Sequence, residues 1–176
     1  MKKFIIALAA PIMLFCAGCG HSSDEGESTE NLNEIKIVIL GDSLSIMVPD
    51  TITGQKEIKE QAWGAIEIKI GTKFQLSIEQ NEGDIELQKS DIEGNDVYKF
   101  QRYIKNEPAL LFWESKIPAM EQSNFHFYTI RKAGNNTYLI KDIDSGDAYS
   151  ENDVQVMIDA AERLKVKEPA TTKPNS

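Results

Sequence analysis

Ile-Glu-Ile-Lys-Ile-Gly-Thr-Lys-Phe-Gln-Leu-Ser-Ile, residues 66–78, is the stretch that decides the fold. Apolar side chains occupy every second position on both sides of the segment Gly71-Thr72-Lys73. Strict alternation predicts two half-buried strands, and a short segment with glycine between them is typical of a hairpin. Strands joined in this way run antiparallel. The sequence therefore predicts an antiparallel sheet in this part of the chain.

Further strands are expected on both sides of this hairpin. Towards the N-terminus, residues 35–40 are apolar, and residues 44–48 alternate until Pro49. Towards the C-terminus, residues 109–114 form a compact apolar strand. Residues 125–131 and 137–143 flank Gly134-Asn135-Asn136, which is typical of a second hairpin.

Two helical patterns lie between these strands. Asp84 is placed to cap a helix that carries Ile85, Leu87 and Ile92, and Gly94-Asn95 interrupts that helix. Apolar residues then recur at helical spacing until Pro108; they are Val97, Phe100 and Ile104.

The helix nearest the C-terminus has the clearest pattern. Ser150-Glu151-Asn152-Asp153 resembles a capping box. One helical face follows, made of Val154, Met157, Ile158, Ala161 and Leu164. Hairpins outnumber strand–helix alternations, which favours an α+β fold: an antiparallel sheet with packed helices, ending in an amphipathic C-terminal helix.

The first eighteen residues have the organisation of a secretory signal peptide. Lys2 and Lys3 precede an apolar run from Phe4 to Phe15, which is too short to span a bilayer as a helix. The run ends in Cys16-Ala17-Gly18-Cys19, which resembles the lipobox of bacterial lipoproteins, although Cys16 stands where that motif usually has leucine. The resemblance implies cleavage between Gly18 and Cys19 and acylation of Cys19. An ordinary cleaved leader without lipid is the alternative.

Composition separates the rest of the chain into a tether, a domain and a tail. Residues 19–34 are acidic and nearly free of apolar side chains, which predicts a disordered tether. Residues 35–165 are expected to form one domain, and residues 166–176 a disordered tail. Loss of residues 1–18 would remove two lysines and no acid, so the net charge would fall from −9 to −11. That charge argues against nucleic acid as a partner.

Gly41-Asp42-Ser43-Leu44 resembles the first sequence block of GDSL-type hydrolases, which would make Ser43 a nucleophile. Such a serine needs a histidine base. The two histidines are His21, in the expected tether, and His126, which lacks the Asp that this family has three residues earlier. Gly-Asp-Ser is also a favourable turn sequence. A serine esterase or lipase using Ser43 is therefore kept as the alternative, and no catalytic residue is assigned.

Two other groups of residues are candidate sites. Oxygen ligands around Gly146 could hold Ca²⁺, but the spacing departs from the EF-hand, and an acidic loop before a helix is favoured instead. These ligands are Asp142, Asp144, Asp147, Glu151 and Asp153. His126 could line a ligand pocket with its aromatic neighbours Phe125, Phe127, Tyr128 and Tyr138. No metal site and no cofactor are predicted, and Trp63 and Trp113 are interpreted as core or rim residues.

From the strand before Pro49 to the closing helix after Tyr149-Ser150, the pattern resembles small exported domains of the PsbP-like and DcrB-like kind. The resemblance implies helices packed on an antiparallel sheet and a non-enzymatic binding or assembly role. We therefore expect a lipid-anchored lipoprotein of the cell envelope, most simply of the outer membrane. Its partners would be the membrane, through the anchor, and an envelope protein or a small ligand.

Overall fold

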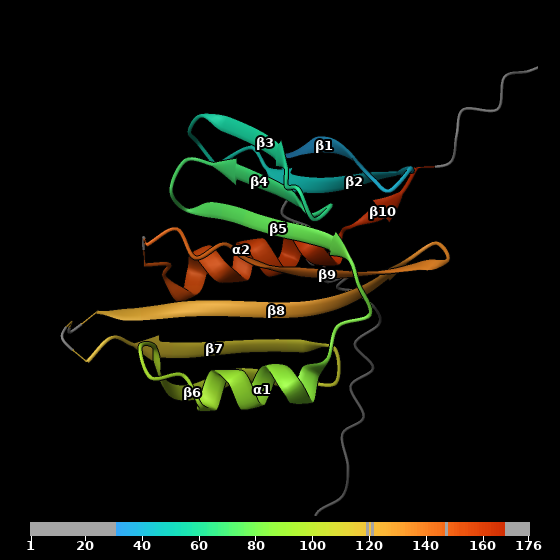
Figure 1. Cartoon of the computed structure of the whole chain (residues 1–176). Coiled ribbons are helices and arrows are strands. Elements are labelled where there is room, and N and C mark those ends of the chain that lie inside the picture. Colours follow the sequence, from blue (N-terminus) through green and yellow to red (C-terminus); the bar gives the residue numbers. More distant parts are fainter. Residues whose placement is uncertain (1–30, 119, 121, 147, 168–176) are drawn as a thin grey trace, which may run out of the picture.

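The computed structural model describes residues 31–118, 120, 122–146 and 148–167. In these residues ten strands and two helices follow one another along the chain (Figure 1). They are β1 (Leu32–Ile39), β2 (Asp42–Pro49), β3 (Lys56–Glu60), β4 (Ile66–Ile70), β5 (Phe74–Gln80), α1 (Ile85–Glu93), β6 (Lys99–Glu107), β7 (Leu110–Lys116), β8 (Ser123–Ala133), β9 (Asn136–Asp142), α2 (Glu151–Glu162) and β10 (Lys165–Val166).

All strand pairs are antiparallel, and the fold is α+β. Seven strands form one sheet in the order β3-β4-β5-β9-β8-β7-β6, and β1-β2-β10 form a smaller one. The predicted hairpin at residues 66–78 is confirmed: Ile66 pairs with Ile78 and Ile70 with Phe74. The second expected hairpin also forms, with Ala133 paired to Asn136 across a two-residue turn.

The two helices cover opposite faces of the large sheet. Helix α2 packs with Phe112, Phe127 and Ile140 in the main core, to which β1 and β2 contribute their inward side chains. Helix α1 packs with Leu111, Tyr128 and Leu139, the neighbouring positions along the same strands. Because successive strand residues point to opposite faces, the two clusters lie on opposite sides of the sheet. Helix α1 covers only the part of its face near β6, β7 and β8 (Figure 1).

Both helix N-termini are capped by the residues that the sequence indicates. The Asp84 side chain accepts a hydrogen bond from the Leu87 amide at 2.9 Å. Ser150 and Asp153 form a reciprocal capping box. Helix α1 buries Ile85 and Ile92 as expected, whereas Leu87 is 60% exposed.

The predicted helix through Val97, Phe100 and Ile104 is wrong, because most of this segment is strand β6. Its pairing with β7 is irregular between Phe100 and Arg102, and again between Tyr103 and Lys105. Each irregularity shifts the alternation of faces, so that Phe100 and Tyr103 both pack beside α1 while Ile104 packs against the main core. The apolar residues of this segment therefore have the sequence spacing of one helical face, although most of them lie in an irregular strand.

The folded region is slightly longer than expected at both ends. Strand β1 begins at Leu32, inside the segment expected to be a tether, and Leu32 pairs with Pro49. Strand β10 follows helix α2 and pairs Val166 with Leu44 on β2. The Lys167 ammonium then reaches Glu34 on β1. These few contacts order residues that composition alone assigned to the tether and the tail.

Candidate functional site

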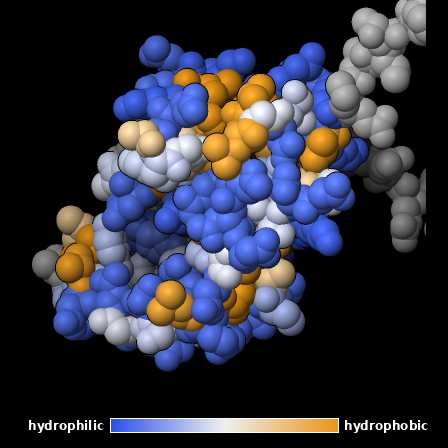
Figure 2. All heavy atoms as spheres, turned by 45° about the vertical axis from the view of Figure 1, so that its right-hand side comes forward, coloured by the Kyte–Doolittle hydropathy of each residue, from blue (hydrophilic) through white to orange (hydrophobic). Residues whose placement is uncertain are grey.

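A concavity lies on the sheet face that carries α1, where that helix leaves the sheet uncovered. A hollow of about 370 Å³ adjoins a second of about 190 Å³, and both are lined by Gln88, Trp113, His126 and Asp144. We call the two together the groove. Its size falls in the range of small-molecule sites. In Figure 2 a recess with largely hydrophilic walls is visible at mid-height on the left.

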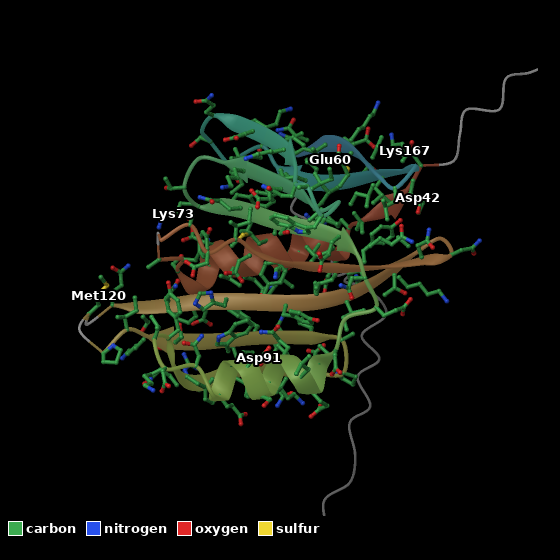
Figure 3. The ribbon with its side chains drawn as sticks, in the orientation of Figure 1. Asp42, Glu60, Lys73, Asp91, Met120 and Lys167 are labelled. Atoms are coloured by element: carbon green, nitrogen blue, oxygen red, sulfur yellow. The ribbon has the colours of Figure 1, made fainter. Side chains whose placement is uncertain are left out.

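Six elements of the fold and adjoining loops line the groove. Strands β4, β5, β7, β8 and β9 supply its floor, helix α1 one wall, and the β3–β4 loop its rim. The floor includes Glu67, Ser77, Glu79, Trp113, His126, Tyr128 and Lys141. Asp91, on α1, lines the smaller hollow, and Figure 3 shows it on that helix in the lower part of the view. Trp63 at the rim is 68% exposed.

His126 is held between aromatic rings at the centre of the groove. Its ring stacks on Trp113 with centroids 5.3 Å apart and an angle of 25°. Tyr98 approaches it edge-on, at 5.6 Å and 75°. Strand β7 places Trp113 directly opposite His126 on β8, so the sheet register itself creates the stack.

Both nitrogens of His126 are also hydrogen-bonded. Nδ1 lies 2.9 Å from Asp142 Oδ2, and Nε2 lies 3.1 Å from Ser115 Oγ. The other oxygen of Asp142 accepts the Phe127 amide at 2.8 Å. Asp142 and Ser115 thus hold the imidazole ring from its two sides. The three side chains come from three neighbouring strands, β7, β8 and β9.

Ser115, His126 and Asp142 are the residue types of a hydrolytic triad, but the serine is not placed for attack. Ser115 is 0% exposed and its hydroxyl also reaches the Asn124 carbonyl at 3.4 Å. It does not line either hollow of the groove. A nucleophile must meet its substrate, so this arrangement fixes the histidine ring rather than activating the serine.

Carboxylates dominate the charge of the groove. Five of its side chains are acidic: Glu67, Glu79, Asp91, Asp142 and Asp144. Among its described lining residues, Lys141 is the only lysine or arginine. Tyr98 donates to Asp144 at 3.2 Å, and burial together with the nearby Asp144 charge raises the pKa of the Tyr98 hydroxyl.

The structure does not bring Ser43 and His126 together. Ser43 is exposed and pairs with Val38 in the β1–β2 hairpin. Its neighbour Asp42 accepts hydrogen bonds from Tyr138 and Asn136, which lower the pKa of that carboxyl. These partners begin β9, whereas Asp142, bonded to His126, ends it. Four to six residues separate them, roughly 13–20 Å of strand. In Figure 3 Asp42 lies beside Lys167, away from the end marked by Met120, near which β8 starts.

The carboxylates weighed as calcium ligands are dispersed. Asp142 faces His126, Asp144 faces Tyr98, and Asp153 belongs to the capping box and lies 3.5 Å from Lys73. Asp147 lies outside the described residues. Within the part of the chain that the structure describes, no three His, Cys, Asp or Glu side chains converge as metal ligands would.

The aromatic pocket hypothesis around His126 is confirmed only in part. His126 and Tyr128 line the groove, whereas the side chains of Phe127 and Tyr138 are buried in the main core at 0% exposure and Phe125 packs against that core. The rest of the groove was missed, because Glu67, Ser77 and Glu79 look in sequence like the solvent side of two strands. Gly18 and Cys19 lie outside the described residues, and none of the described helices is long and apolar enough to cross a membrane.

Comparisons with known proteins add no relative. No protein-family model matches the chain, and neither the curated proteins nor the solved structures contain a significant match.

Proposed function

We propose that this protein is a lipid-anchored cell-envelope protein whose domain binds a small ligand in the groove without transforming it. The observation that supports this most directly is the groove itself, with His126 fixed at its centre by Trp113, Asp142 and Ser115. Rigid polar and aromatic groups in a hollow of this size are what ligand binding requires. The fully buried Ser115 argues for binding rather than hydrolysis.

Native mass spectrometry tests the binding role on the acylated protein, extracted from its own envelope in mild detergent. We expect a small molecule to remain bound to the wild-type protein. Gln88→Trp would place an indole in both hollows and should remove that adduct. Glu107→Gln, at an exposed position on β6 outside the groove, is the matched control and should retain it.

Two results would overturn this proposal. One is wild-type protein free of any adduct. The other is turnover of p-nitrophenyl butyrate that disappears in Ser115→Ala or Ser43→Ala, since this would make the domain a hydrolase.

The lipid anchor is proposed on the sequence alone. Cys19 would carry the acyl chains after cleavage behind Gly18, and residues 20–31 would connect it to strand β1. Two or more acyl chains are needed for stable anchoring. We place the protein at the outer membrane, facing the periplasm or the cell surface.

Metabolic labelling with palmitate tests the anchor. The wild-type protein should incorporate the label and sediment with the membranes, whereas Cys19→Ser should do neither. Cys16→Ser should behave like the wild type, because the proposed cleavage removes residue 16. A labelled, membrane-bound Cys19→Ser protein would contradict the proposal.

A further inference from the structure

We infer that the groove recognises an organic cation, a ligand with an ammonium or guanidinium group on an apolar body. The inference rests on the proposed binding function and adds the chemical class of the ligand. It is supported by three features of the groove: its uncompensated carboxylates, its aromatic rings and the field of the whole chain.

Two carboxylates of the groove have only neutral partners among the contacts of the described residues. Glu79 accepts from the side-chain amide of Asn81 at 3.2 Å. Asp144 accepts from the Tyr98 hydroxyl at 3.2 Å and the Gly146 amide at 3.3 Å. Neutral donors orient a carboxylate without cancelling its charge. Both carboxylates therefore remain available to attract a cation, because no salt bridge neutralises their charge.

Glu67 and Asp142 are already engaged, whereas Asp91 on α1 adds a further carboxylate to the lining. Glu67 lies 3.7 Å from Lys69, and Asp142 is held by His126 and the Phe127 amide. With Glu79 and Asp144 free of cationic partners and one lysine in the lining, the interior keeps a net negative charge. An anionic ligand would have to lose its water beside these groups, which is costly.

Aromatic rings give the groove a second means of holding a cation. Trp113 lines both hollows, Tyr128 lies on the floor, and the exposed Trp63 stands at the rim. The face of such a ring attracts a cation within about 6 Å, and tryptophan does so most strongly. The same rings offer apolar surface to the body of the ligand. Carboxylates and indoles around one hollow thus favour a cation with an organic body over a bare metal ion.

The net negative charge of the whole chain also favours a cationic ligand. A net charge of −9 raises the local concentration of cations and repels anions over roughly one Debye length, about 8 Å at physiological salt.

Three probes of nearly equal shape separate the possible ligand classes: phenethylammonium, 2-phenylethanol and 3-phenylpropionate. Each is titrated into the full acylated protein in detergent, and binding is followed by calorimetry. Phenethylammonium should bind saturably below about 10 mM, the weakest range expected of a ligand of this size. The alcohol should bind at least tenfold more weakly. The carboxylate should not bind, and salt should weaken the ammonium complex several-fold.

Three substitutions locate the binding. Asp144→Asn and Glu79→Gln keep the shape of the groove and remove one charge each, so each should weaken phenethylammonium about tenfold. Trp63→Leu keeps apolar area and removes a ring face, and should weaken it about threefold. Glu107→Gln removes a charge outside the groove and should change binding by less than about twofold, as expected of a screened surface charge.

The outcomes separate this inference from the proposed function. Equal binding of ammonium and alcohol, both lost in Gln88→Trp, would refute the cationic class while the groove remained a ligand site. Ammonium binding that is insensitive to Asp144→Asn and Glu79→Gln would also refute it. The absence of saturable phenethylammonium binding up to about 10 mM would refute it as well. In that case the adduct seen by native mass spectrometry would still show whether the groove binds a ligand.

Discussion

His126 illustrates how much one buried side chain can depend on its neighbours. Only its 8% exposed edge reaches the groove, and its two nitrogens are taken by Asp142 and Ser115. Buried polar groups are costly when unpaired, so each member of this chain of hydrogen bonds holds the next in place. The ring is consequently fixed as part of the wall against which a ligand would lie.

Asp142→Ala should therefore destabilise the protein markedly. The substitution leaves the Phe127 amide and Nδ1 of His126 without their acceptor, and we expect the free energy of unfolding to fall by about 3 kcal/mol. Denaturant unfolding measures the change. Asp144→Ala, an exposed carboxylate two residues away, should cost less than about 0.5 kcal/mol. Equal effects of the two substitutions would contradict this account of Asp142.

Tyr138 should make the stability depend on alkaline pH. Burial, and then its hydrogen bond to Asp42, raises the pKa of its hydroxyl from 10.0 to about 12. A folded pKa above the usual value means that the neutral form stabilises the fold. This contribution is complete below pH 10 and is lost as the pH rises towards 12. Tyr103, whose pKa is also raised to about 12, adds to the same loss.

Tyr138→Phe should accordingly lose less stability than the wild type between pH 10 and pH 12. Denaturant midpoints measured across this range give the comparison. The remaining loss in the variant would come from residues such as Tyr103. Parallel curves for the two proteins would contradict the contribution of the raised Tyr138 pKa to this loss.

At the scale of elements, β6 shows where local pattern and tertiary pairing disagree. The irregularity in its pairing with β7 between Phe100 and Arg102 brings Phe100 and Tyr103 to one face, although they are three residues apart. Their rings lie 4.6 Å apart beside helix α1. Helix α2 shows the opposite case, because its boundary follows from local chemistry at Ser150 and Asp153.

Ser150→Ala tests that local chemistry. The serine hydroxyl accepts the Asp153 amide, and its loss should lower the free energy of unfolding by about 1 kcal/mol. Ser90→Ala, at an exposed position inside α1, should be neutral or slightly stabilising because alanine favours the helix. A neutral Ser150→Ala would mean that packing alone holds the start of α2.

At the scale of the whole molecule, the small sheet closes over the main core and is itself completed from the other end of the chain. Strand β10 pairs with β2, and the Lys167 amide donates to the Ser43 carbonyl at 2.7 Å. Residues more than a hundred positions apart therefore protect one edge of β2. Figure 1 shows β10 meeting β1 and β2 at the end of the molecule opposite the β7–β8 loop.

Truncation after Leu164 should expose that edge. We expect faster amide hydrogen exchange in β2, because the truncated chain lacks the pairing of Lys165 with Ser45 and of Val166 with Leu44. Strands β4 and β5, which lie in the other sheet, serve as the internal reference and should exchange at the wild-type rate. Unchanged exchange in β2 would show that β10 adds no protection.

The sequence alone determined the elements whose signals are local. Alternation and turn residues predicted the hairpin at residues 66–78, and short-range side-chain bonds predicted both helix starts, because neighbours along the chain supply all of these interactions. Only the tertiary structure decided the bulged strand β6, the pairing of β10 with β2 and the groove. His126, Ser115 and Asp142 meet because β7, β8 and β9 lie side by side, and polar residues of β4 and β5 line the groove because α1 leaves that face uncovered. Such proximity depends on strand order and on partial coverage of a sheet, and neither is encoded in any short stretch of sequence.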